Sequence, residues 1–362
     1  MIPVYKPYLP NHITQYAHNA IDSNWISSHG EYLNLATEKL KEINNSKYVL
    51  LTNNGTTAGH LMCLGLTKLY GNKQKIVVPN NVYIAAWNVF KMSTDHEFIP
   101  VDANLETWNA NYHNYLTTNP ENNIVLIVPN LGNIINVPEL QKQFPNNVYI
   151  EDNCEGFLGS YNGVQTGSVS LMSSTSFYGN KTVTCGEGGA LFLNDENLFE
   201  YLNSVRTQGS TTTKFVFDKI GYNYRMTNIQ AALLYGQLMN LDEIIQRKEF
   251  VYNTYHNELK DVDGISLQIE ESNTTHSKWM IGVRFNVTQD KLKQIELWFY
   301  ENGVETRPMF PPITNHKQYM DIQCDITNAQ LLHNQCLIFP SYPELNKSQI
   351  VAICNLIKKS IK

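Results

Sequence analysis

Short, β-branched apolar runs alternate with longer amphipathic stretches from about residue 47 onward. Five of the runs are predicted to form buried strands: residues 47–52 (KYVLLT), 75–79 (KIVVP), 97–101 (EFIPV), 123–128 (NIVLIV) and 147–151 (NVYIE). Between the first two, residues 56–70 have the length and the apolar spacing of a helix. This alternation predicts βαβ units, and therefore an α/β fold with a mostly parallel sheet.

The alternation fades after about residue 235. Residues 237–255 are predicted to form one long helix with charge along one side. Beyond it we expect a strand over residues 279–285, a helix over 289–301 and a closing amphipathic helix over 348–361. We therefore place a domain boundary at residue 240, which separates a large domain of residues 1–240 from a smaller C-terminal domain of residues 241–362.

Composition and charge narrow the classes of partner. The 362-residue chain carries a formal net charge of −6, and its Lys and Arg are not clustered, so neither nucleic acid nor a membrane surface is an expected partner. The longest apolar stretches are far shorter than the ~20 residues of a membrane helix, and residues 1–10 lack the features of a signal peptide. Six scattered cysteines predict reduced thiols and a cytoplasmic location, and the spacing of the histidines favours no metal site.

The first candidate for chemistry is the segment NGTTA, residues 54–58, which follows the first predicted strand and begins a helix. A Gly that permits close backbone approach and two hydroxyls at a helix N-terminus suit a phosphate group, because free N–H groups and the helix dipole both favour an anion. Thr56 or Thr57 can equally serve as the N-cap of that helix. The segment alone leaves both interpretations open.

A second candidate is Asp152, at the end of the strand predicted over residues 147–151. Catalytic carboxylates in open α/β sheets lie at such carboxyl ends, where Asp152 can form an ion pair with a protonated ring nitrogen. The alternative is a surface Asp that caps the following helix.

The most specific segment is SFYGNKTVTCGEGG, residues 176–189, with Lys181 among small, polar and aromatic neighbours. Such surroundings suit a lysine that forms a Schiff base, because its nucleophilicity depends on desolvation or a neighbouring cation. The segment is not a Walker A loop, since Asn180 stands where that motif has Gly. It is not a dinucleotide-binding motif either, because Gly189 comes too early for the third glycine and no obvious strand precedes the segment.

These motifs occur together, in order, as in the DegT/DnrJ/EryC1/StrS family of nucleotide-sugar aminotransferases, which the chain resembles nearly from end to end. The motifs that carry the resemblance are IPVYKPYLP, WISSHG, NGTTA, EDNCEG, SFYGNKTVTCGEGG, GYNYRMTNIQAA, GVETRPMFPP and FPSYPEL. The resemblance implies the aspartate-aminotransferase fold (fold type I), with a large, mostly parallel-sheet domain and a smaller C-terminal α+β domain. It also implies pyridoxal 5'-phosphate (PLP) as cofactor, converted to pyridoxamine 5'-phosphate (PMP) in one half-reaction.

The resemblance also assigns residue roles. Lys181 is matched to the lysine that attaches the cofactor, Asp152 to the partner of the ring nitrogen and Glu155 to the residue near the ring hydroxyl. Tyr83 is matched to an aromatic residue that stacks on the ring, and the phosphate ligands are matched by Thr56, Thr57 and Ser176. Asn223 is matched to an asparagine that reaches the phosphate from the neighbouring subunit of a homodimer.

Taken without the family, Tyr83 is better interpreted as a residue that packs in the core or at an interface, and Arg225 can form a structural pair at a dimer interface. Arg occurs at five positions only, so Arg225 and Arg307 stand out as candidates for phosphate recognition. Trp25 and Ser27, in WISSHG, complete the candidate substrate-binding residues.

WISSHG, the RTQG loop at residues 206–209 and GVETRPMFPP resemble the perosamine and viosamine synthases. This resemblance implies transfer of an amino group from L-glutamate to C4 of a nucleotide-linked 4-keto-6-deoxyhexose. Residues 214–218 (KFVFD) depart from that group, which has an aromatic pair followed by His there. The alternatives are a C3-aminotransferase that acts on a 3-keto sugar nucleotide and a non-enzymatic, PLP-binding regulatory relative.

Overall fold

The computed structural model describes residues 1–92 and 94–361. Its centre is a seven-stranded sheet in the order β1-β9-β8-β5-β4-β2-β3. Six of these strands run in one direction, and β9 runs against its neighbours β1 and β8. The strands are β1 (Tyr48–Thr52), β2 (Lys75–Pro79), β3 (Glu97–Val101), β4 (Ile124–Ile127), β5 (Val148–Asp152), β8 (Met172–Ser176) and β9 (Gly189–Leu193). The fold is the expected α/β fold with a mostly parallel sheet.

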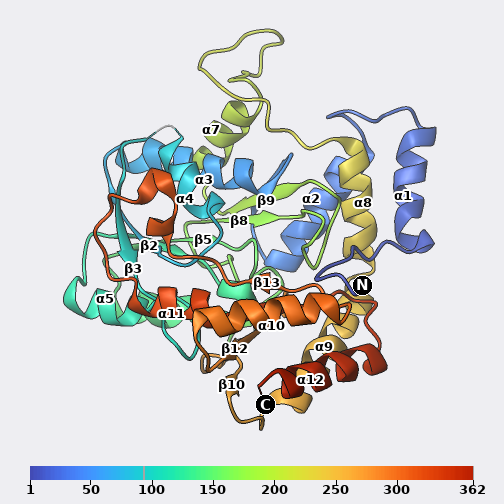
Figure 1. The fold of residues 1–362 in the computed structure, drawn as a ribbon. Coiled ribbons are helices and arrows are strands. Elements are labelled where there is room, and N and C mark those ends of the chain that lie inside the picture. Colours follow the sequence, from blue (N-terminus) through green and yellow to red (C-terminus); the bar gives the residue numbers. More distant parts are fainter. Residues whose placement is uncertain (93, 362) are drawn as a thin grey trace.

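Helices cover both faces of this sheet, as Figure 1 shows. One face packs against α3 (Gly55–Tyr70), α4 (Ala85–Lys91) and α7 (Glu196–Arg206), through alternate strand residues such as Leu50, Val78 and Leu191. The other face packs against α2 (Glu31–Asn44), α5 (Tyr112–Thr118), α6 (Val137–Gln143) and α8 (Asn228–Met239). Strand residues therefore point alternately to two apolar layers, which explains their nearly continuous apolar sequences.

The C-terminal part builds a second sheet in the order β10-β12-β14-β13. Its strands are β10 (Ile265–Ser266), β12 (Ile281–Phe285), β13 (Arg307–Pro308) and β14 (Cys336–Phe339). A separate apolar core joins this sheet to α9 (Leu241–Leu259), α10 (Gln289–Glu301) and α12 (Lys347–Ser360). The expected helix over residues 289–301 and closing helix are present, whereas the division into domains at residue 240 stays a prediction.

The single helix predicted over residues 237–255 is wrong. Helix α8 ends at Met239 and α9 begins at Leu241, because Asn240 leaves the helical conformation with φ −115° and ψ 27°. The Asn240 side chain donates from Nδ2 to the Gly236 carbonyl and so satisfies one open acceptor at the end of α8. Apolar periodicity continues through this break, so it did not reveal the change of direction.

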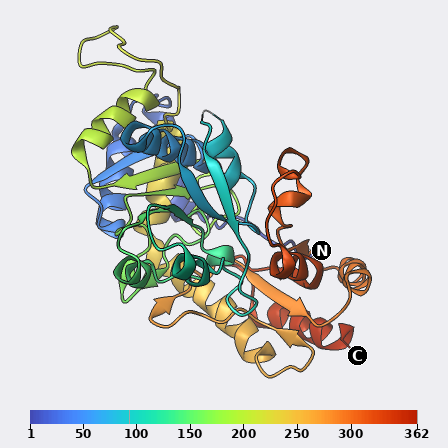
Figure 2. The same ribbon diagram turned by 90° about the vertical axis from the view of Figure 1, so that its left-hand side faces the viewer.

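Two segments extend beyond the elements that precede and follow them in the chain. The chain between α7 and α8 projects from the body as a long loop (Figures 1 and 2). Residues 310–325 rise from the C-terminal part beside α4 and β3, as Figure 2 shows. There the Ile313 N–H donates to Asn80 O at 2.7 Å, and the Tyr319 hydroxyl donates to Asn88 Oδ1 at 2.8 Å. This segment ties the C-terminal part to the edge of the large sheet.

The remaining elements complete the chain. They are α1 (Asn11–Asp22), α11 (Thr327–Gln335), three short 3-10 helices (Asn130–Gly132, Ile313–Asn315 and Lys317–Tyr319) and the small sheet β11-β6-β7, with β6 (Ser160–Tyr161), β7 (Val164–Gln165) and β11 (Thr274–Thr275). All six cysteines are free thiols. No helix among the described residues is both long enough and apolar enough to cross a membrane.

Candidate active site

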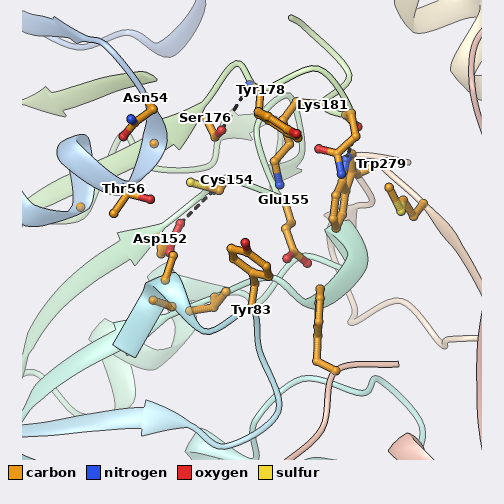
Figure 3. Close-up of a pocket in the computed structure, with 18 of the residues that line it drawn as sticks. Asn54, Thr56, Tyr83, Asp152, Cys154, Glu155, Ser176, Tyr178, Lys181 and Trp279 are labelled. Atoms are coloured by element: carbon orange, nitrogen blue, oxygen red, sulfur yellow. Dashed lines mark hydrogen bonds between the residues drawn. The ribbon is translucent and has the colours of Figure 1, made fainter. Parts of the chain in front are cut away.

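A cavity of about 570 Å³ lies where β5 and β8 end and α3 begins, and β13 and the residues before β12 border it on the C-terminal side. Figure 3 shows side chains from these elements pointing into it. The cavity brings together seven residues singled out from the sequence: Thr56, Tyr83, Asp152, Glu155, Ser176, Lys181 and Arg307. They are up to about 250 positions apart in the chain and come together at the carboxyl ends of the strands of the large sheet.

The start of α3 forms one wall. Asn54 is the N-cap, because its Oδ1 accepts the Thr57 N–H at 2.9 Å. The Thr57 hydroxyl donates to Asn53 Oδ1 at 2.6 Å, so it serves the loop and does not line the cavity. Among the described residues, the N–H groups of Gly55 and Thr56 have no acceptor. The helix therefore offers free donors and its positive dipole end to an anion.

Ser176 lies directly against this helix start. A Cβ added to Gly55 would approach Ser176 Cβ to 2.6 Å, so only glycine lets the two backbones come this close. Ser176 Oγ accepts the Tyr178 N–H at 3.3 Å, and its own proton remains available to a ligand. Gly55, Thr56 and Ser176 together form a cradle for a phosphate group.

Two acidic side chains face the middle of the cavity. Asp152 ends β5, and its Oδ1 accepts the Cys154 N–H at 3.2 Å, which fixes the turn after the strand. Glu155 is buried, and its Oε2 accepts the Leu131 N–H at 2.8 Å. Burial raises the pKa of Glu155 to about 7, although the nearby Lys181 amine and the Leu131 N–H act in the opposite direction.

Lys181 lies on the loop that joins β8 to β9. The expectation that no strand precedes this loop is wrong, because four of the five buried residues of β8 (MSSTS) are Ser or Thr, which an apolar pattern does not reveal. Tyr5 donates its hydroxyl to the Lys181 carbonyl at 2.8 Å, and the Lys181 N–H donates to Tyr178 O at 2.9 Å. These bonds fix the backbone from which the amine enters the cavity.

The sequence did not reveal the role of Trp279, which appeared only as the first residue of a predicted strand. Its ring centroid lies 3.9 Å from Lys181 Nζ, and its indole N–H donates to Asn180 O at 2.8 Å. Trp279 is separated from Lys181 by about a hundred residues. No spacing rule connects them, so only the folded chain makes the contact visible.

Tyr83 and Arg307 both line the cavity, although one precedes and the other follows the domain boundary predicted at residue 240. Tyr83 is 61% exposed and meets Phe310 edge-on at 6.2 Å between ring centroids. Packing of Tyr83 in the core is therefore wrong, whereas packing at a subunit interface stays a prediction. Arg307 forms an exposed ion pair with Glu305 at 3.5 Å, which leaves most of its guanidinium donors available.

Five candidate residues do not line the cavity: Trp25, Ser27, Asn223, Arg225 and Thr57. The first two belong to the connection between α1 and α2, where the Asn228 side chain donates to Trp25 O and the Asn228 N–H donates to Ser27 O, both at 2.6 Å. Asn223 accepts from Arg225 Nε at 3.1 Å, and Arg225 pairs by its backbone with Thr52, at the end of β1.

These residues fit a phosphorylated pyridine aldehyde. The cradle at Gly55 and Ser176 accepts the phosphate, Asp152 offers a carboxylate to a protonated ring nitrogen, and Lys181 offers an amine to the aldehyde. No group of three or more metal-ligating side chains occurs in the part of the chain that the structure describes.

Comparison with protein families then decides the class. Residues 7–358 match the DegT/DnrJ/EryC1/StrS aminotransferase family. The chain belongs to this family. Among its relatives, the GDP-perosamine synthases of Escherichia coli O157:H7 and Vibrio cholerae are 32% and 30% identical to it, over 99% of this chain and 98% of each relative. This enzyme is therefore a sugar aminotransferase by family, as its motifs predicted.

Solved structures agree on the fold. The Escherichia coli GDP-4-keto-6-deoxy-D-mannose-3-dehydratase with bound hydrated PLP superposes with a TM-score of 0.91 at 19% identity, covering 98% of this chain and 99% of that chain. A putative sugar aminotransferase of Streptococcus pneumoniae in its PMP form gives 0.91 at 18% identity, covering 100% and 99%. At such identities the likeness establishes fold type I. Together with the family, these neighbours indicate pyridoxal phosphate as the cofactor.

Proposed function

We propose that this family member transfers the amino group of L-glutamate to C4 of a nucleotide-linked 4-keto-6-deoxyhexose. The product is a 4-amino-4,6-dideoxyhexose of the perosamine or viosamine type, used for glycan biosynthesis. The observation that carries the proposal is the position of Lys181 Nζ in a cavity that also holds Asp152 and the free start of α3. The full-length similarity to GDP-perosamine synthases supports the choice of sugar.

Each wall of the cavity has a separate task in this proposal. The N–H groups of Gly55 and Thr56 and the Ser176 hydroxyl bind the phosphate. The Asp152 carboxylate keeps the ring nitrogen protonated, and Glu155 lies toward the ring hydroxyl. Tyr83 offers a flat apolar face at a small entropic cost, because its side chain has only two rotatable bonds.

When bound, pyridoxal phosphate supplies an electron sink for the carbanion that forms as the donor loses its α-proton. Lys181 Nζ would accept this α-proton as a general base and give it up again as a general acid. Asp152 supports both transfers, since its negative charge stabilises the protonated ring nitrogen. In the second half-reaction the same two groups act in reverse on the keto sugar.

The attachment of the cofactor is tested first. Purified protein supplied with PLP is expected to show a visible absorbance band, and reduction with borohydride should leave a stable mass increment on the peptide that contains Lys181. Lys181→Ala should lose both signals. A wild-type protein that shows neither signal in excess PLP contradicts the proposed function.

The position of amination needs its own test. A relative in Pseudomonas aeruginosa, 24% identical over 90% of this chain, is a UDP-2-acetamido-2-deoxy-3-oxo-D-glucuronate aminotransferase, so the C3 alternative has a representative in the family. We expect turnover with glutamate and 4-keto-6-deoxy sugars, with the new amine located at C4 by NMR. A panel of UDP, dTDP and GDP sugars then identifies the nucleotide, and an amine at C3 overturns the choice of position.

The active enzyme is a homodimer in this proposal, with Asn223 acting in the neighbouring subunit. In its support, the projecting loop between α7 and α8 carries large apolar side chains in solvent: Phe215 is 82% exposed, Phe217 56% and Ile220 91%. A single copy that leaves such residues in water predicts a protein partner. Replacing all three by Ser should shift the sedimentation coefficient from dimer to monomer.

Complementation tests the shared site. Lys181→Ala and Asn223→Ala chains are each expected to be inactive or weak as homodimers. After unfolding and refolding together they should regain activity, because one site of each mixed dimer then has both residues. A refolded mixture whose activity equals the sum of the activities of the two separate variants contradicts a shared site. The cofactor test above does not depend on this result.

A further inference from the structure

The amine of Lys181 has an unusual partner. Its Nζ lies 3.9 Å from the ring centroid of Trp279, and in residues 1–92 and 94–361 it forms neither a hydrogen bond nor an ion pair. The acidic residues that line the cavity are Asp152, Glu155 and Glu187, and none of them forms an ion pair with the amine. The contact of Lys181 Nζ is therefore with the face of an indole, the aromatic ring that attracts a cation most strongly.

Hydrogen bonds fix both the indole ring and the backbone of Trp279. At its far edge the indole N–H donates to Asn180 O at 2.8 Å, one residue before Lys181. At its backbone, the carbonyl accepts from Lys248 Nζ at 2.8 Å, and Lys248 also donates to Ser341 O. Lys248 is fully buried on α9, and Trp279 itself is 4% exposed. The ring is thus a rigid surface held in register with the loop that carries Lys181.

We propose that the face of Trp279 is the resting site of the Lys181 ammonium whenever this amine is not bonded to the cofactor. The proposal rests on the proposed function, since it concerns the two states of the lysine in an aminotransferase. It makes Trp279 a positioning residue, which holds the amine in the cavity after the amino donor has displaced it.

The two states differ in what the amine contacts. Attachment to PLP would form a C=N double bond from Nζ to the aldehyde carbon, with the aldehyde oxygen leaving as water with two protons of the ammonium. In this proposal Nζ leaves the face of the ring on attachment, and the cation–π contact is lost. PMP carries no aldehyde, so it binds while Lys181 stays on Trp279. The contact therefore opposes covalent binding of PLP and is neutral toward PMP.

This asymmetry gives the test a specific signature. Apoprotein is titrated with PLP and, separately, with PMP, and both dissociation constants are measured by calorimetry. Trp279→Leu removes the aromatic face, so PLP should bind about 5- to 30-fold more tightly, as expected for the loss of a desolvated cation–π contact. The affinity for PMP should stay within about twofold. Trp279→Phe, with a weaker aromatic face, should give an intermediate change.

Two backgrounds separate the possible outcomes. In Lys181→Ala protein there is no ammonium, so Trp279→Leu should leave the affinity for PLP unchanged, which completes a double-mutant cycle. A residue that only supports the fold would weaken PLP and PMP together, and that result overturns the proposal. If the wild type binds PLP without attaching it to Lys181, the proposed function fails instead, and the PMP titration still reports on the cavity.

Discussion

Gly55 and Ser176 touch in a way that a single methyl group would prevent. A Cβ on Gly55 would lie 2.6 Å from Ser176 Cβ and 3.0 Å from Ser176 Oγ. Both residues belong to rigid elements, the first turn of α3 and the end of β8, so neither can move far. Their contact sets the spacing of the proposed phosphate cradle.

Gly55→Ala should therefore destabilise the protein and weaken its affinity for PLP. We expect the free energy of unfolding to fall by about 1–3 kcal/mol, because overpacking outweighs the helix propensity that Ala gains. Chemical denaturation of the apoprotein measures this change. Gly179→Ala is the matched control, since its Cβ would meet nothing closer than Gly186 O at 4.0 Å.

A second substitution shows whether the contact itself is responsible. Removing Ser176 Cβ in the double variant Gly55→Ala with Ser176→Gly should restore part of the lost unfolding free energy. If the double variant is only the sum of two losses, the strain does not arise between these two residues.

Glu151, next to Asp152 in β5, predicts a pH dependence of stability. It is buried, and it accepts from Gly167 N at 3.0 Å, from the Tyr161 hydroxyl at 3.3 Å and from Ser170 Oγ. Burial nevertheless raises its pKa to about 7. The folded state therefore holds a proton that the unfolded state releases above about pH 4.5, and stability falls as the pH rises from there to about 7.

Glu151→Gln should remove this part of the pH dependence. Gln resembles the protonated acid here, because the two hydroxyls can accept from its amide while its carbonyl accepts from Gly167 N. Denaturation of apoprotein between pH 5 and 7.5 should show a loss smaller by roughly 2 kcal/mol in the variant, because about 1.4 kcal/mol accompanies each pH unit between pH 5 and the raised pKa. Glu155 titrates in both proteins, so the difference reports on Glu151; equal slopes would contradict the prediction.

The sequence predicted the fold where apolar patterning was continuous. The five strands expected between residues 47 and 151 are present as β1 to β5, because each contains an apolar run and all except the partly exposed edge strand β3 are buried on both faces. The sequence did not predict β8, which is mostly Ser and Thr, or the break at Asn240, where a side-chain cap ends a helix without interrupting the apolar spacing. Local hydrogen bonds determine where such a strand forms and where such a helix ends, and the spacing of apolar residues does not reveal these bonds.

For the site, motifs located Lys181, Asp152 and Ser176, since each is near the end of a strand or in the loop after it. Trp279 and Lys248 escaped notice because their importance depends on contacts across the whole fold. The roles of all the site residues stay predictions, those of Trp25, Ser27, Asn223, Arg225 and Thr57 among them, and so does the cytoplasmic location.

Asn228 holds the segment that contains Trp25 and Ser27. Its buried side chain donates to Trp25 O at 2.6 Å and accepts the Tyr32 N–H at 3.1 Å. Asn228→Ala should lower the free energy of unfolding by about 1–3 kcal/mol, since both partners lose a buried hydrogen bond. If Trp25 and Ser27 bind the sugar nucleotide, KM for that substrate should rise while conversion of the cofactor by glutamate stays unchanged.

A buried asparagine elsewhere supplies the control. Asn123 donates from Nδ2 to Glu121 O at 3.0 Å, at a distance from the cavity lining, so Asn123→Ala should cost similar stability without a change in KM. Equal loss in both half-reactions of the Asn228 variant would show a general effect on the fold and would remove the support for sugar binding by this segment.

Arg307 is expected to bind the phosphates of the nucleotide sugar. It lines the cavity from β13, and its side chain is 46% exposed beside Glu305. Arg307→Gln should raise KM for the sugar nucleotide by about 10- to 100-fold, the effect of one charged hydrogen-bonding group, and leave the reaction of glutamate with the cofactor unaffected. Arg307→Lys should recover only part of the loss, because an ammonium cannot donate two parallel hydrogen bonds.

Arg247 provides a matched comparison for Arg307. Its side chain is 42% exposed and pairs with Glu243 on α9, outside the cavity, so the two arginines have similar exposure and a similar acidic neighbour. Arg247→Gln should therefore leave KM for the sugar nucleotide unchanged. Steady-state rates with varied sugar nucleotide, combined with stopped-flow absorbance of the glutamate half-reaction, separate the two steps. A change confined to the glutamate step in the Arg307 variant would assign this arginine to the amino donor, because only the carboxylates of glutamate would then depend on its guanidinium.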